Sequence, residues 1–224
     1  MLTKTIIILL IVTTGVTSYV IIVNQNSKNM TVRQKFLKAA YPVMMWFTKV
    51  TGTNTFAESN SAVAPQVSLY NLTAVLNNGQ SLGLSEFKGK KILLVNTASD
   101  CGYTGQYEAL EKLHQKYKGK LVILGFPAND FKEQEKGTDE SIAEFCKVNF
   151  GVTFQLMKKS QVVKGPEQNE IFKWLSNKDN NGWNNKAPTW NFCKYLVNEE
   201  GRLVHFFAPS VEPMSSEVLK AVEE

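Results

Sequence analysis

The sequence predicts an α/β domain whose mixed sheet is flanked by helices, and three observations indicate this class. The apolar run Ile92–Thr97 (ILLVNT) is typical of a buried strand, and so is the run Leu121–Phe126 (LVILGF). Apolar residues between the two runs recur at helical spacing, which predicts a strand-helix-strand unit and therefore a parallel strand pair. Near the C-terminus, Tyr195–Asn198 and Leu203–Phe207 flank a polar turn and predict an antiparallel hairpin.

Upstream of this unit, the turn residues Asn77, Asn78 and Gly79 predict an opening hairpin, with strands expected at 67–70 and 79–84. The helix of the central unit is placed by four residues at helical spacing: Tyr107, Leu110, Leu113 and Tyr117.

The later elements follow from cap and breaker residues. Asp139 is expected to cap a helix over 139–150, and Pro166 is expected to start a helix over 166–175. A short strand is predicted at 153–157, and the last helix at 215–222. The domain is therefore expected to occupy residues 65–224.

Length and composition agree with one folded domain and an appendage. The chain has 224 residues, of which 43% are hydrophobic and 20% charged. Its 14 Gly, 7 Pro and 3 Cys exclude a collagen-like chain and a disulfide-dense scaffold.

The first 28 residues are expected to form a membrane anchor or a signal segment. Residues 5–23 carry no charge, and at about 1.5 Å per helical residue such a run can cross a bilayer core of roughly 30 Å. An uncleaved anchor in the cell envelope is favoured over a signal peptide, whose cleavage would release an exported soluble protein. The side of the membrane stays open, because basic residues after the run favour a cytoplasmic body whereas such anchors often deliver their domain across the membrane.

Residues 29–64 are expected to form a juxtamembrane segment. Arg33–Val50 begins basic and becomes apolar, which is typical either of an interfacial helix or of a helix packed on the body. Thr51–Pro65 has no periodicity and is interpreted as a linker.

The basic charge also lies in this N-terminal part. Residues before Ala64 contain six basic residues against Glu58 alone, whereas the remaining chain is neutral, so the net charge of +5 is N-terminal. A nucleic-acid-binding domain needs positive charge on its folded body, so the sequence predicts no nucleic-acid partner and favours a membrane surface.

Several chemistries are absent from the sequence. There is no Cys-x-x-Cys, His-Glu-x-x-His or Gly-x-Ser-x-Gly motif. His114 and His205 are interpreted as structural residues, and neither a metal nor a prosthetic cofactor is expected.

Cys101 is the candidate nucleophile. It directly follows a buried strand in VNTASDCGYTGQY, with a helix beginning a few residues later. Unpaired backbone N–H groups at a helix start favour a thiolate, so this position predicts a reactive thiol.

Three segments, VNTASDCGYTGQY, FPANDFKEQEKG and WNFCKYLVNEEG, resemble in order and spacing the signature segments of the glutathione peroxidase family. The resemblance covers Gln66–Glu224 and none of the first 64 residues. It implies a thioredoxin-like fold and an antioxidant enzyme that reduces hydrogen peroxide or organic hydroperoxides.

By the same resemblance, Cys101 is the peroxidatic residue, and Gln134, Trp190 and Asn191 complete the family's tetrad. These residue types suit the chemistry, because indole and amide N–H groups donate hydrogen bonds to sulfur and to the departing oxygen without titrating.

Cys146 lies in a segment that resembles the one carrying the resolving cysteine in thioredoxin-dependent members. Its attack on a Cys101 sulfenic acid would form an internal disulfide that thioredoxin, or else glutathione, reopens as co-substrate. A purely structural core cysteine is the alternative. Because the Cα atoms of a disulfide lie within about 7 Å, an intact helix at Cys146 is expected to unwind during turnover.

The sequence departs from many relatives at Ala128, where they have cysteine, at Asp130 and at Cys193, which receives no role. The polar run 177–186 stands where assembly insertions occur in tetrameric relatives, so a monomer or small oligomer is expected.

Two alternatives to the peroxidase stay open. One is a peroxide sensor that passes oxidation to a partner protein by disulfide exchange. The other is a disulfide reductase, which Thr104 disfavours because it stands where the second cysteine of a Cys-x-x-Cys motif would lie.

Overall fold

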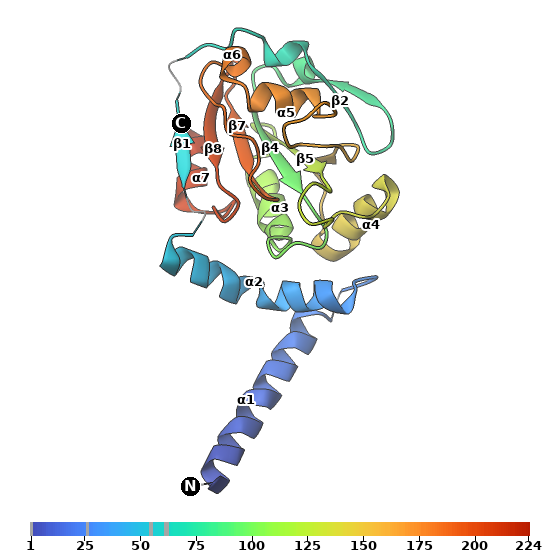
Figure 1. The fold of residues 1–224 in the computed structure, drawn as a ribbon, viewed down its shortest axis with the longest axis vertical. Helices are drawn as coiled ribbons and strands as arrows, with labels where there is room; N and C mark the ends of the chain where they lie inside the picture. The colour runs from blue at the N-terminus through green and yellow to red at the C-terminus, as the bar shows by residue number, and fades with distance from the viewer. Residues whose placement is uncertain (1, 26, 54–55, 61–62) are drawn as a thin grey trace.

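The computed structural model describes residues 2–25, 27–53, 56–60 and 63–224, with residues 2–12 described by their backbone alone. Its centre is a six-stranded mixed sheet in the order β1-β8-β7-β4-β5-β6 (Figure 1). The strands are β1 Ala57–Ser59, β4 Lys91–Thr97, β5 Leu121–Pro127, β6 Gln155–Leu156, β7 Lys194–Val197 and β8 Leu203–Phe207. β4 pairs with β5 in parallel and with β7 antiparallel, which confirms the predicted strand-helix-strand unit and closing hairpin.

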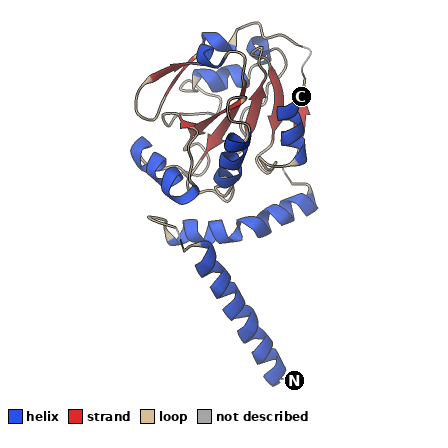
Figure 2. Ribbon diagram, turned by 180° about the vertical axis from the view of Figure 1, so that it is seen from behind, coloured by secondary structure: helices blue, strands red, loops and turns tan. Residues whose placement is uncertain are grey.

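Side chains alternate along β4 and β5, so each face of the sheet has its own apolar core. Leu93 and Val95 lie in one core with α3 (Gln106–Lys116), α4 (Asp139–Phe150) and α7 (Ser216–Glu223). Ile92 and Leu94 lie in the other, with α5 (Glu170–Leu175) and the hairpin of β2 (Thr73–Val75) and β3 (Ser81–Gly83). Figure 2 shows both helical layers around the strands.

Three predicted details were wrong: one element type, one helix start and one cap residue, and in each case a capping side chain accounts for the observed structure. The expected strand at 67–70 is instead the 3-10 helix η1 (Leu69–Asn71), because the Ser68 hydroxyl accepts a hydrogen bond from Tyr70 N–H. The helix expected from Pro166 begins only at Glu170, after Asn169 has capped Ile171 N–H. Thr138, not Asp139, caps α4.

The expected linker at 51–65 also contains a strand. β1 pairs antiparallel with β8 and covers the outer edge of the sheet. Glu58 adds an ion pair with Lys186 across this edge. The polar run 177–186 holds another unexpected element, the short helix α6 (Lys178–Asn181).

Two helices precede the body. α1 (Leu2–Val23) projects away from it, and α2 (Val32–Thr51) lies along its base (Figure 1). α2 starts with a capping box, in which Thr31 and Gln34 satisfy each other's backbone N–H groups.

Within the described residues, no helix combines the length and hydropathy of a membrane span. The span expected at 5–23 includes the side chains of residues 5–12, which lie outside the described ones.

Candidate active site

Cys101 lies in the tight loop that connects β4 to α3, and its side chain is fully buried. Thr104 fixes this loop, because its hydroxyl accepts from Cys101 N–H at 3.0 Å and donates to Ala98 O at 2.9 Å. Tyr103 N–H points at Cys101 Sγ at 3.4 Å. Thr104 therefore shapes the loop at the position where a disulfide reductase would carry its second cysteine.

The structure brings the four predicted site residues together from three loops. Gln134 follows β5, whereas Trp190 and Asn191 directly precede β7. The side chains of Trp190 and Asn191 lie near the Cys101 thiol and, as hydrogen-bond donors, lower its pKa. Asn191 Nδ2 also donates to Gln134 Oε1 at 3.0 Å, and Gln134 O accepts from Asp100 N–H. These two hydrogen bonds join the loop before β7 to the loop after β5, and that loop to the Cys101 loop.

The sequence predicts that a helix start favours the thiolate of Cys101, but the structure favours the neutral thiol. α3 begins only at Gln106, five residues after Cys101. Burial raises the pKa of the Cys101 thiol, and the hydrogen bonds from Tyr103, Trp190 and Asn191 offset this only in part. The neutral thiol is therefore the stable resting form, and the donors stabilise charge that develops when sulfur reacts.

The other two cysteines lie on opposite faces of the sheet. Cys146, on α4, is buried in the same apolar cluster as Cys101, and burial raises the pKa of its thiol to about 12. Cys193 lies in the cluster on the far face. All three are free thiols. Cys146 shares a core with Cys101, and Cys193 does not.

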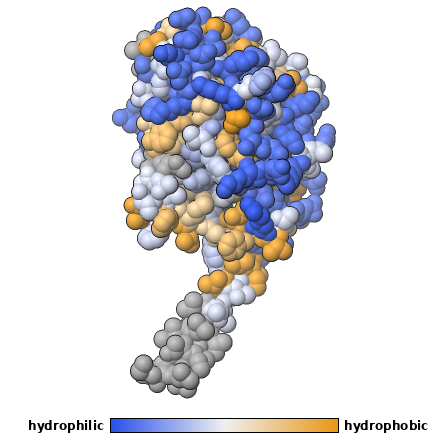
Figure 3. Space-filling view, viewed as in Figure 1, coloured by the Kyte–Doolittle hydropathy of each residue, from blue (hydrophilic) through white to orange (hydrophobic). Residues whose placement is uncertain are grey.

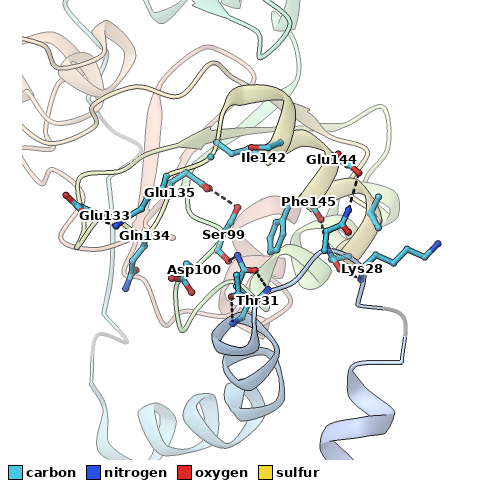
Figure 4. Close-up of a pocket in the computed structure, with 17 residues that line it drawn as sticks. Lys28, Thr31, Ser99, Asp100, Glu133, Gln134, Glu135, Ile142, Glu144 and Phe145 are labelled. Carbon is cyan, nitrogen blue, oxygen red and sulfur yellow. Dashed lines mark hydrogen bonds and ion pairs between the residues drawn. The ribbon is translucent and has the colours of Figure 1, made fainter.

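A pocket of about 500 Å³ opens beside Gln134 (Figure 4). The segment before α2, the Cys101 loop, the loop 133–137 and α4 form its walls. Among the described residues, no group of three or more His, Cys, Asp or Glu side chains is placed to hold a metal ion.

Glu135 is a site residue that the sequence analysis missed. Its side chain is almost fully buried beside the pocket, where Oε2 accepts a hydrogen bond from Ser99 Oγ at 3.1 Å. Burial raises the pKa of this carboxyl to about 7, and Asp100 adds to the increase while Lys159 opposes it. The sequence feature that points to Glu135 is its position next to Gln134 in the KEQEKG segment.

Glu135→Gln is expected to increase stability at neutral pH. Because the folded state raises the pKa from 4.5 to about 7, the carboxyl contributes stability that is complete below pH 4.5 and lost as the pH rises through 7. A neutral amide lacks this loss, so the variant should gain up to roughly 3 kcal/mol relative to wild type between pH 4.5 and 8. Urea unfolding at several pH values measures the difference.

Glu133→Gln is the matched control, since Glu133 lies in the same loop with a largely exposed side chain. A pH-independent difference between Glu135→Gln and wild type would contradict the assignment.

A family model described as glutathione peroxidase matches residues 69–176. A glutathione peroxidase from Lactococcus lactis is 41% identical over 157 residues, which cover 69% of this chain and 99% of the relative. The chain belongs to the glutathione peroxidase family. It is a peroxidase of the oxidoreductase class, as the sequence predicted.

Other relatives agree with this assignment. Glutathione peroxidase-like peroxiredoxin 2 of Saccharomyces cerevisiae is 43% identical over 149 residues, covering 66% of this chain and 91% of the relative. The crystal structure of T. cruzi GPX1 is similar with a TM-score of 0.52 and 31% identity, covering 70% of this chain and 97% of that one. A DsbF homologue from Corynebacterium diphtheriae, at 16% identity and a TM-score of 0.53, covers 77% of this chain and 92% of its own and shares the fold alone. The peroxidase thus has the predicted α/β thioredoxin-like fold.

Proposed function

We propose that this peroxidase reduces hydrogen peroxide or organic hydroperoxides through a sulfenic acid on Cys101, which Cys146 resolves and a thioredoxin-type dithiol regenerates. The observation that carries the proposal is the convergence of the Trp190 and Asn191 side chains on the Cys101 thiol. The presence of Cys146 in the same apolar cluster supports a cycle with two cysteines.

In the first step, Cys101 sulfur attacks one oxygen of the hydroperoxide and the O–O bond breaks. The sulfur gains one oxygen as sulfenic acid, and the other oxygen leaves with the thiol proton as water or an alcohol. Asn191 Oδ1 is buried and has no hydrogen-bond partner among the described residues, so it can accept from the hydroperoxide O–H. Gln134 holds the Asn191 amide in place for this contact.

In the second step, the Cys146 thiol attacks the sulfenic sulfur, a disulfide forms and water leaves with the Cys146 proton. Cys146 lies four residues before the last residue of α4, and its carbonyl accepts hydrogen bonds from Gly151 and Val152. Only the end of the helix has to unwind for this thiol to move, and helix ends are where backbone bonds are weakest. A dithiol reductant then reduces this disulfide, which restores the Cys101 and Cys146 thiols and leaves the reductant with a disulfide of its own.

Gly151→Ala is expected to accelerate disulfide formation. Gly151 ends α4 with φ of 66°, a conformation that costs alanine about 1 kcal/mol, and no neighbour lies within 4 Å of an added Cβ. Because unwinding releases that strain, the rate after peroxide addition should rise by about fivefold. Loss of free thiols in stopped-flow measures the rate.

Gly119→Ala is the matched control, since Gly119 also has positive φ and open space but lies in the turn before β5. Equal acceleration in both variants would contradict a requirement for α4 to unwind before Cys146 attacks.

We further propose that residues 5–23 anchor the protein in a membrane of the cell envelope. The uncharged run and the direction of α1, away from the body, support this placement (Figure 1). Lipid hydroperoxides then become accessible substrates, and the protein acts as a monomer or small oligomer. Release as an exported soluble protein is the alternative.

The proposed function is tested with the full chain by following peroxide consumption with thioredoxin plus its reductase and, separately, with glutathione. We expect efficient turnover with thioredoxin and slow turnover with glutathione. Faster turnover with glutathione would overturn the proposal that a thioredoxin-type dithiol is the reductant. Absence of turnover with either, together with mixed disulfides to a partner protein, would favour a peroxide sensor.

A further inference from the structure

The surface of α2 divides lengthwise into two apolar faces, one on the body and one exposed. The exposed side chains recur at spacings of three, four and seven residues, which places them on one stripe: Val32, Phe36, Val43, Trp46, Phe47 and Val50. Each of them is at least 59% exposed, whereas in residues 66–224 only Val67, Val75 and Val148 are exposed large hydrophobic residues. Figure 3 shows the apolar surface gathered at the base of the body, where α2 lies. This stripe, hereafter the α2 stripe, is an unusual surface for a protein in water.

The opposite face of α2 packs on the loop that carries Cys101. A Cβ built on Gly102 would lie 2.9 Å from Met44 Sδ, and one on Gly105 would lie 2.5 Å from the Tyr41 ring. Gln34 Nε2 donates to Ser99 O at 3.2 Å. The peroxidatic loop is therefore directly across α2 from the α2 stripe.

α1 leaves from the side of α2 that bears the stripe. Tyr19 Oη donates to Ala39 O at 3.2 Å, and Ala39 falls on the stripe between Phe36 and Val43. Asn24 Nδ2 donates to Lys35 O at 3.2 Å. A surface that the proposed anchor enters would thus face the α2 stripe.

The charged residues of α2 and of the segments that flank it are all basic. No acidic residue precedes Glu58 in the sequence, while Lys28, Lys35 and Lys49 lie before, beside and near the end of the stripe. Arg33 is held by Asp100, and Lys38 lies over the Phe150 ring, so these two belong to the contact with the body. Apolar side chains bordered by lysines fit the interface of an anionic bilayer, where acyl chains meet phosphates.

We propose that the α2 stripe binds the surface of an anionic lipid bilayer and holds the peroxidatic loop toward it. The helix lies in the plane of the interface, with Trp46 and Phe47 at the level of the headgroups and lysines reaching the phosphates. Insertion of α1 alone does not require this contact, because a tethered body could stay away from the lipid. The inference therefore goes beyond the proposed anchor and does not depend on catalysis.

The contact is tested with the full chain in vesicles of phosphatidylcholine with phosphatidylglycerol, made with ordinary or with brominated acyl chains. Brominated chains quench tryptophan that touches the lipid. We expect quenching of the wild type and loss of most of the quenchable emission in Trp46→Phe, since Trp174, Trp183 and Trp190 belong to the body. Equal fractional quenching of the two proteins would overturn the proposal.

A matched pair of valines tests the α2 stripe itself. Val43→Glu should reduce the Trp46 quenching by about half or more, because a carboxylate opposes both the apolar and the anionic part of the interface. Val75→Glu, on β2 of the body, should leave it unchanged. Equal quenching in vesicles of phosphatidylcholine alone would overturn the requirement for anionic lipid. Unquenched Trp46 in a chain that sediments as a dimer would assign the stripe to a second copy instead.

Discussion

Replacing Cys101 with serine is expected to remove peroxide turnover, by on the order of 10³-fold or more, because the reaction needs a sulfur nucleophile. A serine hydroxyl is of similar size and still accepts the hydrogen bond that Tyr103 N–H now gives to sulfur. The loop keeps its fixing contacts through Thr104, so the loss is chemical rather than structural. Peroxide consumption with thioredoxin measures it, and unfolding in urea checks that stability is retained.

Cys193→Ala is the control for this experiment. Cys193 is fully buried in the core on the other face of the sheet, so its truncation is expected to cost about 1–2 kcal/mol of stability and leave turnover intact. Retained turnover in Cys101→Ser, combined with loss of turnover in Cys193→Ala, would identify Cys193 as the nucleophile instead of Cys101.

The part of the fold that the sequence predicts well is the part with strong local patterns. β4, α3 and β5 have long apolar periodicities and short connections, and the four site residues lie in motifs with fixed order. β1 has only three residues and no alternating pattern. β1 forms because the edge of β8 offers unpaired backbone groups. β8 is distant in the sequence, so the residues around β1 alone do not predict the strand.

The electrostatic state of Cys101 could not be predicted for a similar reason. A position before a helix indicates a lowered thiol pKa, yet burial by other segments raises it. Trp190 and Asn191, about 90 residues away in the sequence, lie against the thiol, and α2 packs on the same loop. The sequence pattern of α2 fits both an interfacial and a packed helix, and the structure gives α2 both a packed and an exposed apolar face.

Cys146→Ala is expected to lower thioredoxin-driven turnover by about 100-fold or more while the first oxidation of Cys101 survives. Without a second thiol in the same core, the sulfenic acid cannot close an internal disulfide. One equivalent of peroxide should then disappear per chain, after which consumption continues only at the residual rate. A sulfenic-acid reagent such as dimedone should label Cys101 in this variant and not in wild type. Full turnover in Cys146→Ala would make Cys146 a core residue alone.

The pH dependence of disulfide formation separates the two roles of Cys146 further. Burial holds the pKa of this thiol at about 12, so the attacking thiolate is scarce at neutral pH. The rate should rise with pH by up to about tenfold per unit until the pKa of the thiol is reached. Unwinding the end of α4 exposes the thiol to water and lowers its pKa toward the ordinary value, so Gly151→Ala should shift this rise to lower pH. Cys193→Ala should leave the profile unchanged, because Cys193 shares no core with the reacting sulfurs.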